Sequence, residues 1–385
     1  MENFTIVNPV KIIFGKGTIQ NISNEIPKDN KVLMVYGGGS IKKNGVYEQV
    51  QQALKSYEVY EFAGIEPNPH YETCMNAVAL IKEKGINYVL AVGGGSVIDA
   101  VKFIVAAACF ENGDPWTIVS TGAKVEKALP FGTVLTLPAT GSEMNSGSVI
   151  TRAETQDKRA FNSPLVFPKF SVLDPTATYS LPAKQTGNGV VDAFVHVMEQ
   201  YLTQYNGSAM LQDYMSEGIL KTLINEGPKA LENPADYDVR ANLMWASTWA
   251  LNTWIAAGVP QDWATHMIGH EITAFYGIDH GQTLAIVLPG VMQVLREQKS
   301  NKIIRLGREV FGINQQSKDK AIDETIKAVE NFFESMGIKT HLADYNLGDE
   351  AIEKVSSRLG ERGWKLGEAH NITADTVRQI LTLRK

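Results

Sequence analysis

Short apolar runs and amphipathic segments alternate along the first 180 residues of this chain. The apolar runs are rich in β-branched side chains and several end in glycine, which is typical of buried strands. They predict strands at residues 31–36, 59–62, 88–92 and 134–138. Between them, apolar positions with helical spacing predict helices at residues 46–56, 71–84 and 97–108. Strands that alternate with helices favour a largely parallel sheet that is covered on both faces.

The pattern changes near Leu181 and Pro182. Beyond this point strand-like runs fade and longer helical patterns follow, at residues 190–205, 209–231, 239–256 and 263–275. From about Ser300 the chain reads as charged amphipathic helices. We therefore predict an α/β domain at residues 1–182 and an all-helical domain at residues 183–385.

Four of the seven histidines gather in one stretch of the second half. Asp192 and His196 are four residues apart, so on a helix they share one face, and His266 and His270 repeat that spacing. His280 follows after a glycine-containing break. A carboxylate with several imidazoles is a ligand set for a first-row divalent cation.

A single Asp-x-x-x-His pair is more often an ordinary surface or core pair than a metal site. Two such pairs and a further histidine in apolar surroundings favour metal, because buried polar groups need partners. A zinc-protease motif is excluded, since Ala274 stands where His-Glu-x-x-His requires its second histidine. Spacing alone leaves open which of His266, His270 and His280 are ligands.

A second motif, Gly93-Gly94-Gly95-Ser96, lies between a predicted strand and a predicted helix. Glycines allow close backbone approach and positive φ, and the N–H groups of a helix N-terminus bind phosphate. A plain tight turn is the alternative, but it seldom needs three glycines. The sequence is neither G-x-G-x-x-G nor a P-loop.

A similar loop, Gly37-Gly38-Gly39-Ser40, ends the 31–36 strand and is followed by Lys42 and Lys43. NAD-binding enzymes usually carry a carboxylate at this strand end, where it accepts a hydrogen bond from the ribose 2′-hydroxyl. None is present here, so the loop suits a 2′-phosphate. The alternative is an ordinary loop with solvated lysines. The hydroxyl-rich segment 136–143 is a weaker signal for cofactor contacts.

Composition narrows the class of protein. The chain has 385 residues, 44% hydrophobic and 20% charged, with a net charge of −6, which argues against nucleic acid and anionic membranes. Its two cysteines have no CxxC partner, which fits a reducing compartment. Without a signal-peptide pattern or a spanning apolar run, we expect a cytoplasmic protein.

Taken together, these motifs resemble the iron-containing (group III) alcohol dehydrogenases, and within them the branch of NADPH-dependent butanol dehydrogenases and broad-specificity aldehyde reductases. The matching segments follow the family's order along nearly the whole chain, at residues 14–17, 37–40, 66–69, 93–102, 136–143, 187–199 and 258–280. The resemblance implies a dehydroquinate synthase-like architecture. Its parts are an N-terminal Rossmann-like nucleotide-binding domain with a parallel sheet and a C-terminal all-helical metal-binding domain. Cofactor and metal are expected to meet in the cleft between them.

The resemblance also implies roles for individual residues. The expected metal ligands are Asp192, His196, His266 and His280. His270 matches a histidine near the nicotinamide and substrate, and we expect it to relay a proton as a catalytic residue. The expected cofactor-binding residues are Gly37, Gly38, Gly39, Ser40, Asn68, Gly94, Gly95, Ser96, Asp99, Thr136, Thr140, Ser142 and Lys158.

The implied activity is reversible hydride transfer between NADP(H), preferred over NAD(H), and a primary alcohol/aldehyde pair such as butanol and butyraldehyde. One divalent metal, Fe²⁺ or Zn²⁺, would polarise the substrate oxygen, and we expect a homodimer. The alternatives are a metal- and nicotinamide-dependent lyase or synthase resembling dehydroquinate synthase, a polyol dehydrogenase, or a structural metal beside an inactive cleft.

Overall fold

The computed structural model describes residues 1–204 and 207–385, and by its contacts the chain forms two compact units. We call them the sheet unit and the helical unit. The sheet unit comprises residues 7–181 and 234–248, and the helical unit comprises residues 1–6, 182–233 and 249–385.

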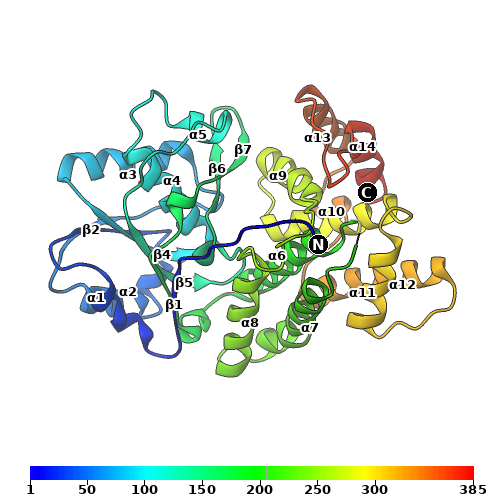
Figure 1. The fold of residues 1–385 in the computed structure, drawn as a ribbon, viewed down its shortest axis with the longest axis horizontal. Coiled ribbons are helices and arrows are strands. Elements are labelled where there is room, and N and C mark those ends of the chain that lie inside the picture. Colours follow the sequence, from blue (N-terminus) through cyan, green and yellow to red (C-terminus); the bar gives the residue numbers. More distant parts are fainter. Residues whose placement is uncertain (205–206) are drawn as a thin grey trace. The chain divides into compact units, whose positions relative to one another are not determined.

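A six-stranded parallel sheet organises the sheet unit (Figure 1). Its strand order is β1-β8-β5-β4-β2-β3, with bounds β1 Lys11–Phe14, β2 Lys31–Tyr36, β3 Glu58–Phe62, β4 Tyr88–Gly94, β5 Phe131–Leu137 and β8 Phe170–Leu173. In register, Leu33 faces Val89 and Val92 faces Val134. The predicted parallel sheet is therefore confirmed. The short strands β1 and β8 were missed, as was an antiparallel hairpin of β6 (Gly147–Arg152) and β7 (Asp157–Asn162).

Alternation along the strands sends apolar side chains to two separate cores. In β2, Leu33 and Val35 join a core with helices α3 (Tyr71–Lys84) and α4 (Gly95–Ala108). Val32 and Met34, on the opposite face, join a core with the short helices α1 (Ile22–Glu25) and α2 (Val46–Ala53). Figure 1 shows these helix pairs on opposite sides of the sheet. Both faces are buried, which explains why the strands read as continuous apolar runs.

Helices make up the helical unit, as the pattern predicts. They are α6 Ala183–Tyr201, α7 Met210–Glu232, α9 Ala264–Tyr276, α10 His280–Val294, α11 Ser300–Phe311, α12 Lys318–Ser335, α13 Asp349–Glu361 and α14 Ala374–Thr382. Helix α6 begins earlier than the predicted start at residue 190, and Tyr205, at the predicted end, lies outside the described residues. Helix α10 was not predicted, because Pro289 and Gly290 interrupt its pattern.

One helix prediction is wrong at its end. The predicted helix 239–256 is α8, which covers only Tyr237–Ala250. Beyond it, Thr253 has a left-handed φ of 79°, and the Asn252 side chain accepts a hydrogen bond from the Trp254 N–H at 3.2 Å. The backbone of a non-glycine residue at such a φ cannot continue an α-helix. The apolar residues beyond Ala250 therefore lie in a turn and not in a helix.

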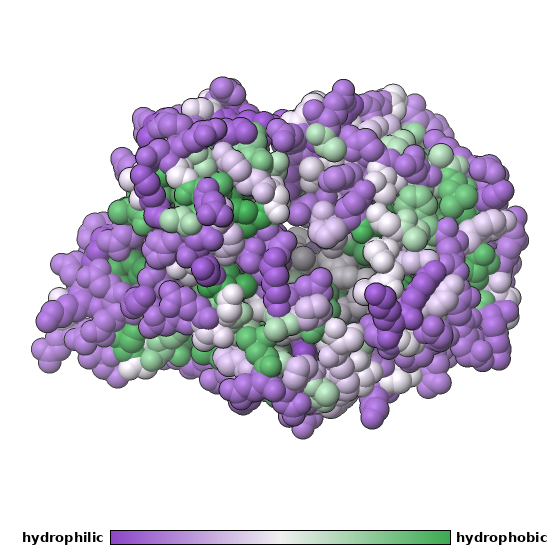
Figure 2. Space-filling view, turned by 180° about the vertical axis from the view of Figure 1, so that it is seen from behind, coloured by the Kyte–Doolittle hydropathy of each residue, from purple (hydrophilic) through white to green (hydrophobic). Residues whose placement is uncertain are grey.

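Hydrophilic residues dominate the face shown in Figure 2, with apolar patches scattered among them. Among the described residues, no helix combines the length and apolar character needed to cross a bilayer.

Candidate metal centre and cofactor loops

Helix α6 carries two of the expected ligands on one buried face. Asp192 and His196 are 5% and 4% exposed, and Asp192 Oδ1 lies 3.6 Å from His196 Nδ1. The two side chains are therefore neighbours on one helix face, as their i,i+4 spacing predicts. Burial of a carboxylate beside an imidazole is costly unless a positive charge accompanies it.

Two further helices of the same unit bring imidazoles to this carboxylate. His266, in the first turn of α9, places Nε2 3.7 Å from Asp192 Oδ1. His280, the first residue of α10, places Nε2 at the same distance. Ligand atoms of Asp192, His196 and His266 all lie within 4.8 Å of one another. Three imidazoles from three helices therefore converge on Asp192, which makes four donors in all.

Glycine next to His280 permits this approach. A Cβ on Gly281 would lie 2.5 Å from the carbonyl oxygen of Asn188 on α6. Only glycine allows the first turn of α10 to pack so closely on α6. This close packing of α10 on α6 places His280 near Asp192.

The donor set fits a divalent metal. His266 Nε2 is buried and forms no hydrogen bond within the described parts of the chain, although it lies near Asp192 Oδ1. A buried nitrogen lone pair of this kind is unusual unless it has a ligand. Imidazole and carboxylate donors suit iron, zinc and related ions, and four protein ligands leave room for an additional ligand when the coordination number exceeds four.

The negative charges beside His266 also favour a cation at this site. Burial alone lowers the pKa of His266, but the carboxylates of Glu199 and Asp192 outweigh burial and raise it to about 9. The two buried carboxylates therefore favour a positive charge at the His266 ring. A metal ion bound between them would supply that charge.

His270 lies beside the cluster, one turn along α9 from His266. It is 5% exposed, and its ring centroid is 5.1 Å from that of His280 and 6.2 Å from that of His266. Neither His270 nor His280 belongs to the close group of Asp192, His196 and His266. His280 differs from His270 in that its Nε2 lies 3.7 Å from Asp192 Oδ1. Its position fits a residue next to the metal site.

In the sheet unit, most of the expected cofactor residues lie at the carboxyl ends of neighbouring strands. Strand β4 pairs with β2 on one side and β5 on the other, all parallel. The loops that follow these three strands therefore emerge at one edge of the sheet. These loops are residues 37–40, residues 93–96 and residues 136–142. Open α/β sheets bind ligands at this edge.

Packing explains the three glycines at residues 93–95. A Cβ on Gly93 would lie 2.5 Å from Val97 Cγ2, and a Cβ on Gly95 would lie 2.5 Å from Thr140 Cγ2. The expected positive φ is absent from this loop, so that part of the prediction is wrong. Close helix-to-strand packing is the reason for glycine here. It brings the N-terminus of α4 against Thr140.

A buried lysine joins α4 to the hydroxyl-rich turn. Lys102 Nζ donates to Ser142 Oγ at 2.8 Å, to Asn145 Oδ1 at 2.8 Å and to the Gly147 carbonyl at 2.7 Å. The Ser142 hydroxyl in turn donates to Asp99 Oδ1 at 2.5 Å. Burial lowers the pKa of Lys102 to about 8, against the opposing charges of Asp99 and Glu143, and raises the pKa of Asp99. The network fixes the turn that follows β5.

The two lysines after Ser40 differ in their surroundings. Lys42 Nζ lies 4.7 Å from the ring centroid of Tyr47 and 4.0 Å from Glu61 Oε2. Lys43 forms no ion pair with any residue in the described ranges. Of the two cations, Lys43 is thus the one available to a ligand at this loop.

Lys158 on β7 is 4% exposed and donates to Asn68 Oδ1 at 2.8 Å. Asn68 has a left-handed φ of 56° in the Glu66–Pro69 turn. The two residues that the resemblance paired with the cofactor are thus in contact with each other.

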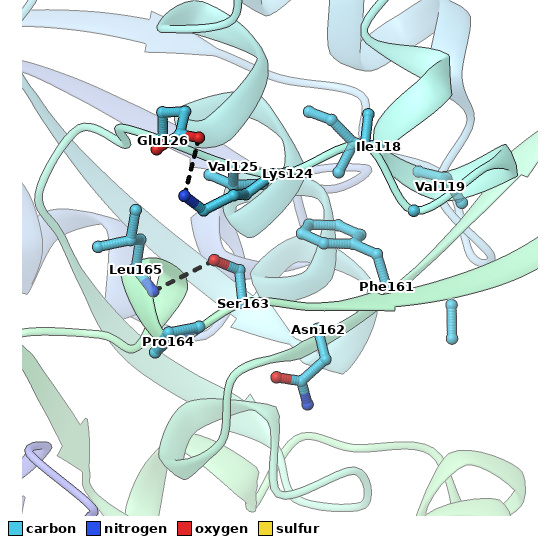
Figure 3. A pocket seen from close by; sticks show the side chains of 13 residues that line it. Ile118, Val119, Lys124, Val125, Glu126, Phe161, Asn162, Ser163, Pro164 and Leu165 are labelled. Carbon is cyan, nitrogen blue, oxygen red and sulfur yellow. Dashed lines mark hydrogen bonds and ion pairs between the residues drawn. The ribbon is translucent and has the colours of Figure 1, made fainter.

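A cavity of about 620 Å³ elsewhere in the sheet unit contains none of these residues. Figure 3 shows its lining side chains, with Phe161 among apolar neighbours and a Lys124–Glu126 ion pair of 2.9 Å. Most of the expected cofactor residues lie in the strand-end loops, and none of them lines this cavity.

Sequence reasoning missed two supporting residues. Glu199 contacts His266, and Lys102 holds Ser142. For Glu199 a signal existed, since positions 192, 196 and 199 fall on one helical face. For Lys102 no signal existed, because an apolar helix pattern does not indicate which groups the amino group of a buried lysine contacts.

The geometry agrees with comparisons to known proteins. Residues 9–175 match the family described as iron-containing alcohol dehydrogenase, and residues 186–384 match the C-terminal domain of that family. The chain belongs to the iron-containing alcohol dehydrogenase family.

Its relatives cover its whole length. It is 55% identical over 383 residues to the NADPH-dependent aldehyde reductase YqhD of Escherichia coli K12, covering 99% of both chains. It is 42% identical over 386 residues to a probable NADH-dependent butanol dehydrogenase of Bacillus subtilis, again covering 99% of both. A crystal structure of E. coli YqhD superposes with a TM-score of 0.98 at 53% identity, covering 100% of this chain and 99% of that one.

Proposed function

We propose that this chain is a metal-dependent aldehyde reductase and alcohol dehydrogenase that uses NADP(H) and acts on short primary alcohols and aldehydes such as butanol and butyraldehyde. The observation that carries the proposal is the convergence of His196, His266 and His280 on Asp192 in a chain of this family. When bound, the metal polarises the substrate oxygen and NADPH supplies the hydride.

The proposed ligands are Asp192, His196, His266 and His280. Their burial excludes water from most of the site, while the His280 side chain is 22% exposed and marks its open side. For His270, beside His280, we propose transfer of a proton between solvent and the substrate oxygen.

The proposed cofactor contacts lie at the sheet edge described above. Backbone N–H groups of Gly94, Gly95 and Ser96 at the start of α4 suit a pyrophosphate. The remaining contacts are proposed for Asn68, Asp99, Thr136, Thr140, Ser142 and Lys158.

Preference for NADP(H) over NAD(H) is supported by the loop Gly37, Gly38, Gly39 and Ser40, which has no carboxylate, and by the uncommitted cation of Lys43. The relatives differ in this respect: YqhD is NADPH-dependent by name, and the B. subtilis relative is NADH-dependent by name. One or two charge-assisted hydrogen bonds of about 1.5–3 kcal/mol each give a preference of roughly tenfold to somewhat above ten-thousandfold.

We further propose that residues 1–182 serve as the dinucleotide-binding domain and residues 183–385 as the metal-binding catalytic domain. We also propose a cytoplasmic homodimer. Sedimentation analysis tests the dimer.

The deciding experiment combines metal analysis of the purified protein with NADPH and NADH oxidation rates on a short aldehyde series. The proposal expects one divalent metal per chain and turnover of butyraldehyde with NADPH. Absence of turnover with every aldehyde, despite bound metal, would contradict it and favour a structural metal.

A further inference from the structure

One buried carboxylate beside the metal site has not been assigned a role. Glu199 lies on α6, seven residues after Asp192 and three after His196, and is 2% exposed. These spacings place it on the ligand-bearing face of the helix. It therefore reaches the same side of α6 as the expected ligands.

Both side-chain oxygens of Glu199 accept hydrogen bonds from the start of α9. Oε1 accepts the Thr265 N–H at 2.5 Å, and Oε2 accepts the His266 N–H at 3.2 Å. These are N–H groups of the first helical turn, which have no partner within their own helix. The carboxylate thus caps α9 from a different helix and fixes the position of His266.

The same carboxylate also holds the His266 ring. Oε2 contacts His266 Nδ1, while His266 Nε2 on the other side of the ring lies 3.7 Å from Asp192 Oδ1. Within residues 1–204 and 207–385, His266 is the one ion-pair partner recorded for Glu199. A carboxylate is only an acceptor, so Nδ1 must carry the proton it receives. The Nε2 lone pair is then left for a metal.

We propose that Glu199 is a positioning residue of the metal site: it fixes the tautomer, orientation and basicity of the His266 imidazole, and so sets the affinity of the site for its divalent ion. A carboxylate behind a ligating histidine has these effects in metal sites generally. The inference rests on the proposed function, because it takes His266 to be a ligand.

Glu199→Gln is the direct test. The amide offers one acceptor for the α9 N–H groups, and its NH₂ then faces Nδ1 as a donor. This favours the opposite tautomer, with the proton on Nε2. We expect the affinity of the apoprotein for Co²⁺ or Zn²⁺, measured by chelator competition, to fall about 10- to 100-fold, while saturating Co²⁺ still gives one ion per chain with a visible spectrum close to that of the wild type.

Glu217→Gln is the matched control. Glu217 is also a buried carboxylate, 4% exposed, but it accepts from the Tyr201 hydroxyl at 3.0 Å and pairs with Arg305, away from the ligands. Its loss should leave metal affinity unchanged. Glu199→Asp restores an acceptor and should recover part of the affinity, and it serves in place of Glu199→Gln if that variant does not fold.

The outcomes separate the two proposals. A wild-type apoprotein that binds neither ion refutes the metal site itself. Wild-type binding with unchanged affinity in Glu199→Gln overturns the role of Glu199 alone. Complete loss of the ion at saturation, as expected for His266→Ala, would also overturn it, because Glu199 would then be a ligand.

Discussion

The candidate metal site of the helical unit and the proposed cofactor loops of the sheet unit are built from different parts of the polypeptide. Around Asp192, side chains from α6, α9 and α10 converge, and each is an imidazole or a carboxylate. At the sheet edge, glycines and strand-end turns bring backbone to the site. A side-chain site depends on which residues are present. A backbone site depends on which side chains are absent, so packing competes with ligand binding as the explanation.

Removing one ligand tests the side-chain site most strongly. His280→Ala should leave the protein without bound metal and reduce kcat/KM for butyraldehyde by about a thousandfold or more, because polarisation of the substrate oxygen is lost. Metal analysis and steady-state rates measure this. His341→Asn, at an exposed histidine of the same unit, is the control. Full metal occupancy in His280→Ala would show that the ligand assignment is wrong.

Adding a carboxylate tests the backbone site. Gly37→Asp should lower or reverse the NADPH preference, a change of roughly tenfold to somewhat above ten-thousandfold in the ratio of kcat/KM values, because the aspartate repels a 2′-phosphate and accepts from a 2′-hydroxyl. A Cβ at Gly37 would lie 3.2 Å from the Ile65 carbonyl, whereas none of the surrounding atoms lies within 4 Å at Gly38. Gly38→Asp therefore adds the charge without that contact. If both variants keep the wild-type ratio, this loop does not read the ribose.

His270→Ala distinguishes a neighbour of the metal site from a ligand. We expect full metal content and a rate lower by at least about a hundredfold, the usual contribution of a positioned proton donor. Parallel metal analysis of His266→Ala gives the reference for a lost ligand. If His270→Ala loses metal to the same extent, His270 belongs to the ligand set.

Lys102 tests whether the backbone site relies on a buried charge. Its pKa is about 8 in the folded protein and 10.5 as the ordinary value, so between these pH values the unfolded chain binds one more proton. Stability attributable to Lys102 therefore rises with pH across this interval and is lost as pH falls through 8, by up to about 3 kcal/mol. Urea unfolding of wild type and Lys102→Met from pH 7 to 10.5 measures it. Lys55→Met, at an exposed lysine, controls for the loss of one positive charge. A constant difference between wild type and Lys102→Met would contradict the expectation.

The smallest effect is expected from a single methyl group. Gly95→Ala should cost about 1–3 kcal/mol of unfolding free energy, because its Cβ would meet Thr140 at 2.5 Å. Gly38→Ala, with open space around its Cβ, should be close to neutral. Equal stabilities would mean that the 93–95 turn shifts freely and that packing does not explain its glycines.

Periodicity alone determined much of the fold. Apolar runs ending in glycine located β2 and β4, because a strand buried on both faces needs no polar positions. The short strands β1 and β8 escaped prediction, since four residues carry too little pattern. Helix α8 was extended too far, because apolar composition continues past the turn at Thr253.

For the site, the sequence by itself determined the pairs that one helix creates. Asp192 and His196 face each other because an α-helix repeats every 3.6 residues. Only the tertiary structure placed His266 and His280 next to Asp192. It also decided that Glu199 contacts His266 and that Lys102 contacts Ser142. These contacts join separate helices and turns, and their geometry depends on close packing at glycines such as Gly281, which no local pattern encodes.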